Sequence, residues 1–464
     1  GCDAKELFSP YKIARNLDFD TYRNKYNTLF LNMQEFLSRT KNIYELLDRM
    51  KRLVLRDLKR EYPNVDYFDD TDLIESMQDV YQETNCPFVV IIDEWDCVFR
   101  EYQQDKKAQE EYLDFLRDFL KDKVYVALAY LTGILPIKKY GTHSALNMFD
   151  EFTMLDPGPL AEYVGFTEQE VQELCPQYDM SYDKMKQWYD GYDLKGIQIY
   201  NPRSVVMSLS GHDFDSYWTK TETYEALKKY IQMDMYNLKE LVTRLIAGSS
   251  IEINPDKFQN DMTTFASADD VLTLLVHLGY LTYDFDTCTV HIPNQEVQKE
   301  FINCIEDGGW EPVMDAIRKS EELLAATIRG EEETVARMIE NAHQENTSIL
   351  AYNDENSLAC VIALAYYSAK KNYVVYRELA GGKGFADMVF VPRKTTQTPA
   401  IVVELKWNQT AEAAITQIKR KQYVESLKDY RGEVILVGIN YESKELKKDD
   451  YKKHSCKIER ITMA

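Results

Sequence analysis

The segment Ala400–Lys406 reads AIVVELK, a short apolar run that ends in a glutamate and a lysine two residues apart. Because the side chains of a β-strand alternate between the two faces of a sheet, Glu404 and Lys406 are expected to point to the same face. The nearby segment Ala386–Val391, ADMVFV, has the composition of a second strand and carries Asp387 at its start. The two segments predict adjacent strands that bring two carboxylates and one lysine together.

These three side chains are suited to one kind of chemistry. Mg²⁺ is a hard cation that prefers oxygen ligands, so Asp387 and Glu404 together could bind it. A bound metal lowers the pKa of its water and neutralises charge on a phosphate, and Lys406 could position that water. The pattern thus favours a phosphodiesterase site. The alternative is a surface ion pair between Glu404 and Lys406, because an apolar run ending in E-x-K is common by chance.

The surrounding segments extend the pattern in a fixed order. A helix is expected at Glu355–Lys370, with Glu355 near its start, and a later helix at Thr410–Leu427 carries QIKRKQY from Gln417. The strands are expected at Tyr373–Glu378, Ala386–Val391, Ala400–Lys406 and Val434–Gly438, with the Gly-rich turn GGKG after the first. Lys419, Arg420 and Lys421 are candidates for phosphate contacts on the second helix.

This whole segment, YRELAGGKGFADMVFVPR…PAIVVELKWNQTAEAAITQIKRKQY, resembles the PD-(D/E)XK nuclease superfamily over about 115 residues. The resemblance implies that Asp387 and Glu404 bind the metal and that Lys406 assists the water. It further implies supporting roles for Glu355 and Gln417. One departure is Phe385, which stands where a basic or polar residue is expected and could weaken a phosphate contact. Members of this superfamily can lose catalysis, so the resemblance is more specific for the fold than for activity.

A second motif, FVVIIDEWD, lies at Phe88–Asp96. A continuous apolar run ending in acids is typical of a strand buried on both faces of a parallel sheet. Val124–Gly133 (VYVALAYLTG) is expected to be another buried strand, after a helix at about Asp105–Lys121, and residues 27–33 have a strand's composition too. This alternation predicts an α/β domain. The alternative is that Asp93 and Glu94 merely end a strand.

The acidic end of this run resembles the Walker B segment of a P-loop ATPase. The resemblance implies that Asp93 holds Mg²⁺ through water, that Glu94 polarises the attacking water and that Thr132 is a polar sensor. The motifs WYDGY, IYNPRSV, YW and HIPNQEV extend it to a bacterial AAA-ATPase-like family over roughly residues 1–305. That family joins such a domain to a C-terminal nuclease-like domain.

The stretch G-x-x-x-x-G-K-[ST], which cradles phosphates in P-loop enzymes, does not occur in this sequence. The chain starts with Gly1, and its first residues resemble the part of the family that follows the P-loop helix. We therefore expect an N-terminally truncated form that does not bind ATP through a P-loop of its own. We also expect an unpaired strand edge beside Phe88–Asp93, where the P-loop strand would lie.

Composition sets wider limits. The chain has 464 residues, 45% of them hydrophobic, and its first residues contain no apolar signal segment. Its longest charge-free runs are shorter than the roughly 18 residues needed to span a bilayer. Eight cysteines without a CxxC pair indicate a reducing compartment, so a cytoplasmic location is expected.

The net charge of −22 argues against indiscriminate nucleic-acid binding, yet residues 351–464 hold 19 Lys and Arg against 14 Asp and Glu. That asymmetry suggests a separate C-terminal module.

Other residues carry weaker signals. The six histidines, His143, His212, His277, His291, His343 and His454, show no ligand spacing and are expected to be structural or on the surface. The aromatic residues around Trp188 and Tyr189 favour packing between elements over a recognition surface. The stretch Val271–Asn294 predicts a helix followed by a hairpin, as in a small winged-helix arrangement.

The prediction is an α/β protein with a partial P-loop-type parallel sheet lacking the P-loop, a helical and winged-helix-like middle and a PD-(D/E)XK domain. The domains are expected at 1–160, 161–305, a helical linker at 306–349, and 350–464. The leading function is Mg²⁺- or Mn²⁺-dependent cleavage of nucleic acid, DNA first, with ATP-dependent control in the full-length protein. The alternatives are an ATP-driven regulator whose nuclease-like domain only binds nucleic acid, and an interaction protein with both sites inactive. A homo-oligomer remains open, and no membrane partner is expected.

Overall fold

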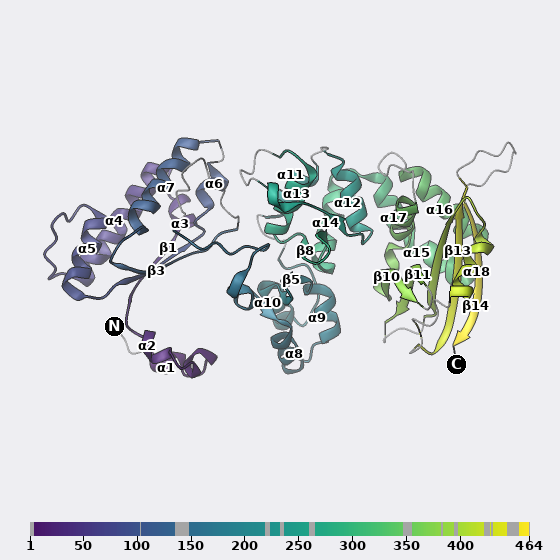
Figure 1. Cartoon of the computed structure of the whole chain (residues 1–464), viewed down its shortest axis with the longest axis horizontal. Helices are drawn as coiled ribbons and strands as arrows, with labels where there is room; N and C mark the ends of the chain where they lie inside the picture. The colour runs from purple at the N-terminus through teal and green to yellow at the C-terminus, as the bar shows by residue number, and fades with distance from the viewer. Residues whose placement is uncertain are drawn as a thin grey trace. The chain divides into compact units, whose positions relative to one another are not determined.

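The computed structural model describes residues 4–102, 104–134, 148–218, 223–232, 236–258, 265–346, 355–381, 384–393, 398–421, 427, 430–442 and 454–463. The chain divides into two compact units. Unit 1 comprises Gly1–Gly158 and Pro255–Ala266, and unit 2 comprises Pro159–Asn254 and Ser267–Ala464. Each is described by itself below, with the labels of Figure 1.

Unit 1 is built on a three-stranded parallel sheet in the order β1-β2-β3. Its strands are β1 (Asn27–Asn32), β2 (Phe88–Asp93) and β3 (Val126–Leu131). Its helices are α1 (Lys5–Phe8), a 3₁₀ turn (Lys12–Arg15), α2 (Phe19–Tyr22), α3 (Met33–Leu37), α4 (Ile43–Glu61), α5 (Leu73–Thr84), α6 (Cys97–Glu101) and α7 (Lys106–Leu120), with a further 3₁₀ turn at Pro255–Lys257.

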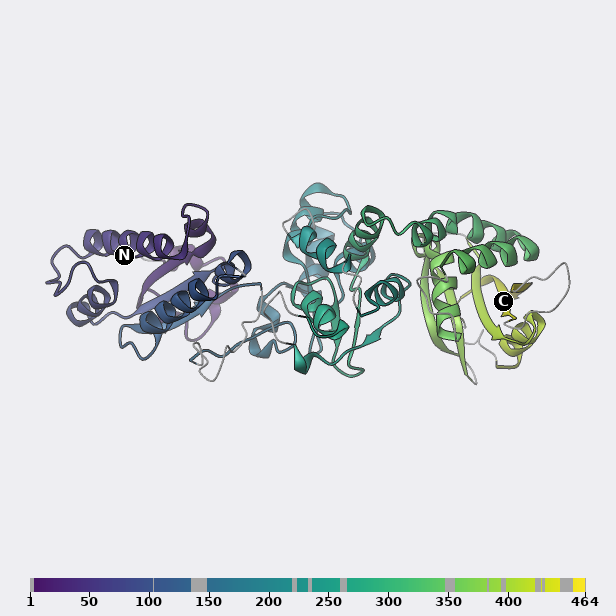
Figure 2. The same cartoon turned by 90° about the horizontal axis from the view of Figure 1, so that it is seen from above.

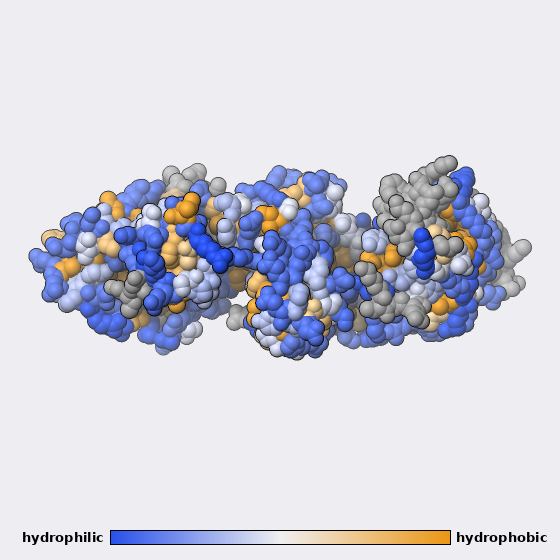
Figure 3. All heavy atoms as spheres, turned by 90° about the horizontal axis from the view of Figure 1, so that it is seen from below, coloured by the Kyte–Doolittle hydropathy of each residue, from blue (hydrophilic) through white to orange (hydrophobic). Residues whose placement is uncertain are grey.

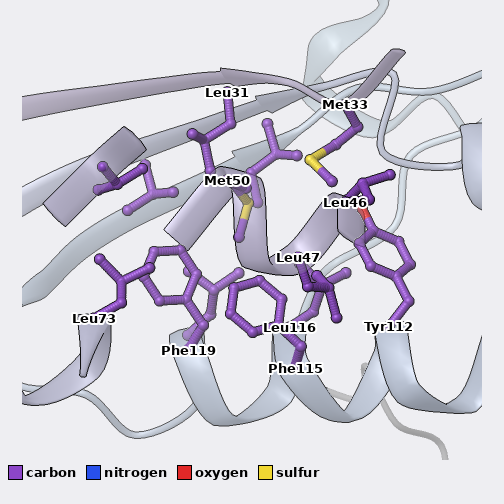
Figure 4. Close-up of a cluster of buried hydrophobic side chains, with 14 of the residues drawn as sticks. Leu31, Met33, Leu46, Leu47, Met50, Leu73, Tyr112, Phe115, Leu116 and Phe119 are labelled. Atoms are coloured by element: carbon purple, nitrogen blue, oxygen red, sulfur yellow. The ribbon is translucent and has the colours of Figure 1, made fainter. Parts of the chain in front are cut away.

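The core of unit 1 lies between the sheet and the helices α4, α5 and α7. Helix α4 begins at a capped end, where the Asn42 side chain accepts a hydrogen bond from the backbone N–H of Glu45 at 2.9 Å. It buries residues at helical spacing, among them Leu46 and Met50. Figure 4 shows Leu31 of β1 directed toward these side chains and toward Phe119 of α7.

Two expectations for this sheet are wrong. β2 is the central strand, with β1 and β3 paired to its two sides, so neither edge of the Phe88–Asp93 strand is unpaired. The expected burial of Val124–Gly133 also fails, because Leu128 and Tyr130 are 56% and 44% exposed. β3 pairs with only one strand in the described residues, and one of its faces is left in contact with solvent. An apolar composition therefore does not guarantee burial at the edge of a sheet.

The first part of unit 2 is mainly helical, with two small antiparallel sheets in the orders β4-β6-β5 and β7-β9-β8. As expected, a helix, α13, is followed by a hairpin, β8–β9. The elements are a 3₁₀ turn (Gly158–Tyr163), β4 (Phe166–Thr167), α8 (Glu168–Gln177), α9 (Tyr182–Tyr189), β5 (Tyr192–Leu194), β6 (Ile197–Tyr200), α10 (Pro202–Gly211), α11 (Thr223–Ile231), α12 (Leu238–Ile246), β7 (Ile251–Glu252), α13 (Ala268–His277), β8 (Thr282–Asp284), β9 (Thr289–His291) and α14 (Gln295–Asp307).

A buried acid joins three of the sequence motifs in this part. Glu296, at the start of α14, is 1% exposed and accepts hydrogen bonds from the Ser204 hydroxyl at 2.7 Å and from the backbone N–H groups of Tyr217 and Trp218 at 2.7 and 2.9 Å. Tyr189 is also buried, and its hydroxyl donates to the carbonyl of Asp215. Glu296 and Tyr189 therefore stabilise the fold from within rather than form a recognition surface.

The last part of unit 2 is a five-stranded sheet in the order β10-β11-β12-β13-β14, with helices on both faces (Figures 1 and 2). β12 and β13 are parallel, and the other neighbours are antiparallel. The elements are α15 (Glu311–Arg329), α16 (Glu332–Asn346), α17 (Glu355–Ala365), a 3₁₀ helix η4 (Tyr367–Lys371), β10 (Tyr373–Gly381), β11 (Gly384–Pro392), β12 (Ala400–Trp407), α18 (Ala411–Lys421), β13 (Gly432–Tyr441) and β14 (His454–Met463).

The two faces of this sheet are covered by different helices. Helix α18 lies on the face that includes Gly438, where an added Cβ would come within 2.3 Å of the Ala411 carbonyl oxygen. Tyr441 points to the opposite face and contacts His343 of α16. Helices α15 and α16, expected as a linker, pack on each other, and α16 also packs against α17 and β14. The edge strand β14 was not expected from the sequence.

Figure 3 shows one face, on which hydrophilic residues prevail and apolar residues form small patches. Among the helices formed by the described residues, none has both the length and the apolar character needed to cross a bilayer.

Replacing Glu296 by Ala tests the buried acid network. The change leaves the hydroxyl of Ser204 and two backbone N–H groups without their acceptor, so we expect a loss of about 3 kcal/mol in the free energy of unfolding. The measurement is urea unfolding followed by circular dichroism. Glu296→Gln keeps an acceptor of the same shape and should stay close to wild type. A small loss in Glu296→Ala would contradict the structural role.

Wild type and Glu296→Gln together test the ionisation of Glu296. Burial raises the pKa of this carboxyl above its usual value, although hydrogen bonds from Trp218 and Ser204 favour the charged form. Its contribution to stability is therefore complete at low pH and is lost as the pH rises through the raised pKa of the folded state. The amide in Glu296→Gln does not ionise, so the stability of this variant relative to wild type should increase from about pH 4 to about pH 7. A constant difference would contradict the raised pKa.

Candidate metal and nuclease site

Asp387 lies where the strands β11 and β12 separate. Their ladder runs from the Phe390–Ile401 pair to the Met388–Val403 pair. At the next position, one carboxylate oxygen of Asp387 accepts a hydrogen bond from the backbone N–H of Leu405 at 2.6 Å. The carboxylate thus accepts the hydrogen bond that a backbone carbonyl of β11 would accept in a continued sheet, and this bond fixes it beside β12. The expected proximity of the two strands is confirmed.

Glu404 and Lys406 lie on the same face of β12 and contact each other. The Lys406 ammonium donates to one Glu404 oxygen at 2.8 Å and to the carbonyl of Leu405 at 2.9 Å. The side chains of Glu404 and Lys406 are only 2% and 10% exposed. The alternative of a surface ion pair is therefore wrong, because this pair is buried.

Helix α18 supplies the next contact. The Gln417 side-chain amide donates to the same Glu404 oxygen that Lys406 contacts. Two donors therefore orient this carboxylate, one from the strand itself and one from the helix that covers it. On the same helix Lys419 is ion-paired with Glu459. Arg420 is exposed, as Lys419 is, so exposure alone does not distinguish them as phosphate contacts.

For two further residues of the sequence pattern, only the position in the backbone is described. Glu355 is the first residue of α17, but its side chain lies outside the described part of the chain. The same holds for the side chain of Phe385 in β11. The structure therefore brings together Asp387, Glu404 and Lys406 and adds Gln417 to them.

The donor set fits a hard cation. Carboxylate and carbonyl oxygens are what Mg²⁺ prefers, and Asp387, Glu404 and the Leu405 carbonyl supply them on adjoining strands. Among the residues that the structure describes, no group of three or more His, Cys, Asp or Glu side chains is arranged to hold a metal. A metal here would thus depend on two carboxylates, backbone oxygen and water, which is typical of Mg²⁺.

A second group of polar residues lies at the carboxyl edge of the unit 1 sheet. The Thr132 hydroxyl donates to Asp93 at 2.6 Å, and the Asn32 amide approaches the other Asp93 oxygen at 3.4 Å. These residues end or follow β3, β2 and β1 in turn, and the carboxyl ends of parallel strands are where α/β sheets bind ligands. Asp93 and Thr132, which the resemblance assigned separate roles, are therefore in direct contact.

Glu94 is held by a neighbouring arginine. It has a positive φ of 55°, and its carboxylate is ion-paired with Arg100 of α6. Burial raises the pKa of Glu94, the Arg100 charge opposes that shift, and Asp96 and Asp93 add to it. The Arg100 guanidinium also lies 3.6 Å from Asp96. Glu94 is therefore engaged within the protein, and no sequence pattern pointed to Arg100 as its partner.

Sequence reasoning also missed a buried chain of histidines. His343 of α16 and His454 of β14 lie with their ring nitrogens 3.2 Å apart, and the other ring nitrogen of His454 contacts Glu340. Both were expected to be structural or on the surface, and their burial agrees with the structural role. Residues 111 positions apart in the chain gave no spacing signal.

Comparison with known families identifies two domains in the chain. Residues 2–142 match a family described as a predicted AAA-ATPase, and residues 353–451 match the PD-(D/E)XK nuclease superfamily. The protein therefore combines an AAA-ATPase-like domain with a PD-(D/E)XK nuclease-superfamily domain. This confirms the two-domain resemblance and the α/β fold class.

Individual similar proteins match this chain at lower identity or over a smaller part than a family assignment would need. An uncharacterised protein encoded in the vnfD 5′ region of Azotobacter chroococcum mcd 1 is 28% identical over 141 residues, which cover 29% of this chain and 27% of that protein. The match thus spans only about a quarter of the relative's length. The Aeropyrum pernix ORC2 protein is similar over 66% of this chain and 85% of its own, at 11% identity and a TM-score of 0.25. Cdc6p of Pyrobaculum aerophilum is similar over 65% and 83%, at 10% identity and a TM-score of 0.20.

Thermal unfolding with added metal tests the donor set. Because a ligand that binds only the folded state stabilises it, Mg²⁺ or Mn²⁺ at about 100 times its Kd should add about 2.7 kcal/mol and raise the Tm. This metal-dependent rise should vanish in Asp387→Asn and in Glu404→Gln. Glu459→Gln is the matched control, since Glu459 lies on the edge strand β14, pairs with Lys419 and should keep the full rise. An equal rise in all variants would exclude these ligands.

Proposed function

We propose that the C-terminal domain is a metal-dependent nuclease that hydrolyses phosphodiester bonds of nucleic acid. The observation that carries this proposal is the burial of Glu404 beside Lys406, next to the anchored carboxylate of Asp387. Burying charged groups costs free energy, and a structural strand end does not need them. The burial of these charged groups is explained if they form a site that binds a cation and a phosphate.

In the proposed site each residue has a separate task. Asp387 and Glu404 would hold Mg²⁺ or Mn²⁺, which when bound supplies the positive charge that activates water and neutralises the phosphate. Lys406 would move from Glu404 to the water or to the phosphate oxygens, with its reach limited by its place on β12. Gln417 is a positioning residue that orients Glu404. Glu355 would support the metal from the start of α17.

The balance of the reaction is a simple hydrolysis. The oxygen of water forms a bond to phosphorus, and the bond from phosphorus to the leaving oxygen breaks. The proton lost by water passes to solvent or to a non-bridging oxygen, and the leaving oxygen takes up a proton. Lys406 keeps its positive charge throughout and stabilises the additional negative charge of the pentacovalent phosphate.

For the N-terminal domain we propose a regulatory part that is coupled to ATP. The grouping of Asp93, Thr132 and Asn32 at the carboxyl edge of a parallel sheet supports a site for nucleotide-bound Mg²⁺. Arg100 would have to release Glu94 before that carboxylate could polarise water. The alternative is a regulator whose nuclease-like domain binds nucleic acid without cutting it.

A cleavage assay on single- and double-stranded DNA and on RNA tests the nuclease. With Mg²⁺ or Mn²⁺, we expect wild type to cut and Asp387→Asn, Glu404→Gln and Lys406→Met to lose about 100-fold or more in rate. Lys457→Met is the control for Lys406, because Lys457 lies on the edge strand β14 and pairs with Glu332 instead of Glu404. Circular dichroism verifies that each variant is folded.

Two results would contradict the proposal. Cleavage that survives in Glu404→Gln and Lys406→Met would come from another site or from a contaminant. Binding of nucleic acid by folded wild type without metal-dependent cutting, both with and without ATP, would favour the regulator.

A further inference from the structure

A cavity of about 410 Å³ lies within unit 2, away from the residues of the proposed nuclease site. Its wall comes from the segment after α12, the hairpin β8–β9, the start of α14 and the 3₁₀ helix η4. Pockets of about 300–1,000 Å³ are typical of small-molecule sites. Hydrogen-bonding side chains line it: Ser250, Thr287, Thr289, His291, Gln298 and Lys370.

Lys370 of η4 lies in the wall of this cavity, and a second cation, Arg377 of β10, lies near Lys370 without lining the cavity itself. The Lys370 ammonium donates to the carbonyl of Ile246 at 3.2 Å, and the Arg377 guanidinium donates to the hydroxyl of Ser249. Both of these acceptors are neutral, and Lys370 also lies 5.1 Å from the centre of the Tyr367 ring. Among the described residues, no Asp or Glu forms an ion pair with either cation.

The one acid in the wall is already engaged. The carboxylate of Asp284 accepts hydrogen bonds from the backbone N–H groups of Asp286 and Thr287, each at 2.9 Å, and these bonds lower its pKa. Burial and, after it, the charge of Arg377 lower the pKa of Lys370 to about 8. Two like charges partly removed from water, without a carboxylate to pair with, are costly. An anion in the cavity would offset that cost.

The backbone leaves room for such an anion. Gly248 lines the cavity with a φ of +91°, a conformation that residues with a Cβ rarely adopt, and an added Cβ would lie 3.9 Å from the Lys370 nitrogen. The hydroxyls of Ser250 and Thr289 and the ring of His291 can donate hydrogen bonds to oxygen. Positive charge combined with several neutral donors is the pattern of phosphate recognition.

We propose that this cavity binds a phosphate monoester of mononucleotide size, with Lys370 contacting the phosphate and the nearby charge of Arg377 adding to the attraction. The phosphate can come from a free nucleotide or from the 5′ end of a short nucleic acid, and both present the same chemical group. Burial of Lys370 beside a positive neighbour favours a dianion over a neutral ligand. The site does not depend on the proposed cleavage, because none of its residues belongs to the Asp387–Glu404–Lys406 group.

Titration calorimetry in EDTA tests this site without any metal. The probes are inorganic phosphate, the four 5′-nucleoside monophosphates, and a trinucleotide with and without a 5′-phosphate. Wild type should bind a phosphate-bearing probe, and Lys370→Met should weaken that binding about tenfold or more. Lys371→Met is the matched control, because Lys371 is 76% exposed, lies next in sequence and faces Glu321. This control should bind as wild type does.

Additional variants and probes distinguish the possible results of this binding experiment. Thr287→Tyr narrows the exposed rim of the cavity and should also weaken binding, so the test holds even if Lys370→Met unfolds. Binding of the mononucleotides identifies a free nucleotide as the source, and binding of the 5′-phosphorylated trinucleotide alone identifies a nucleic-acid end. Glu404→Gln should keep full affinity. The proposal is overturned if wild type binds no phosphate-bearing probe, or if Lys370→Met and Lys371→Met bind equally.

Discussion

The burial of one carboxylate, that of Glu404, is the constraint on which the C-terminal domain depends. A charged group that is 2% exposed must be compensated, and Lys406 and Gln417 do so from two directions. Because Lys406 is two residues away on the same strand, its contact needs no particular tertiary fold. The contact with Gln417 does, since it requires α18 to lie directly on the sheet.

That close approach has its own physical cause. Gly438 of β13 is paired with Glu404 in the sheet, and it leaves space for Ala411 and Ala414 of α18. A side chain at this position would force the helix away and with it the amide of Gln417. The opposite face is covered by α16 and α17, so the sheet is held on both sides while the carboxyl end of β12 carries the polar residues. The fold thus gives the site a rigid support, which a metal site built on only two carboxylates requires.

The parts of the fold and of the candidate site that depend on residues close together in the chain could be predicted from the sequence. The two-residue period of a strand placed Glu404 with Lys406, and the apolar run before Asp93 marked a strand end that Thr132 indeed approaches. Long-range pairing was less accessible. β14 was missed because its residues alternate without a strong apolar face, and β3 was wrongly expected to be buried because composition does not reveal a sheet edge. The partners of Glu94 and His454 were found only in the structure.

We propose that Asp387 and Glu404 share a divalent cation. The most direct measurement is a crystal structure of the protein soaked with Mn²⁺, with anomalous data collected to locate the metal. We expect one Mn²⁺ bound by a carboxylate oxygen from each residue, with the Lys406 ammonium moved off Glu404. Anomalous density elsewhere in the chain, or an undisturbed contact between Lys406 and Glu404 at saturating Mn²⁺, would contradict it.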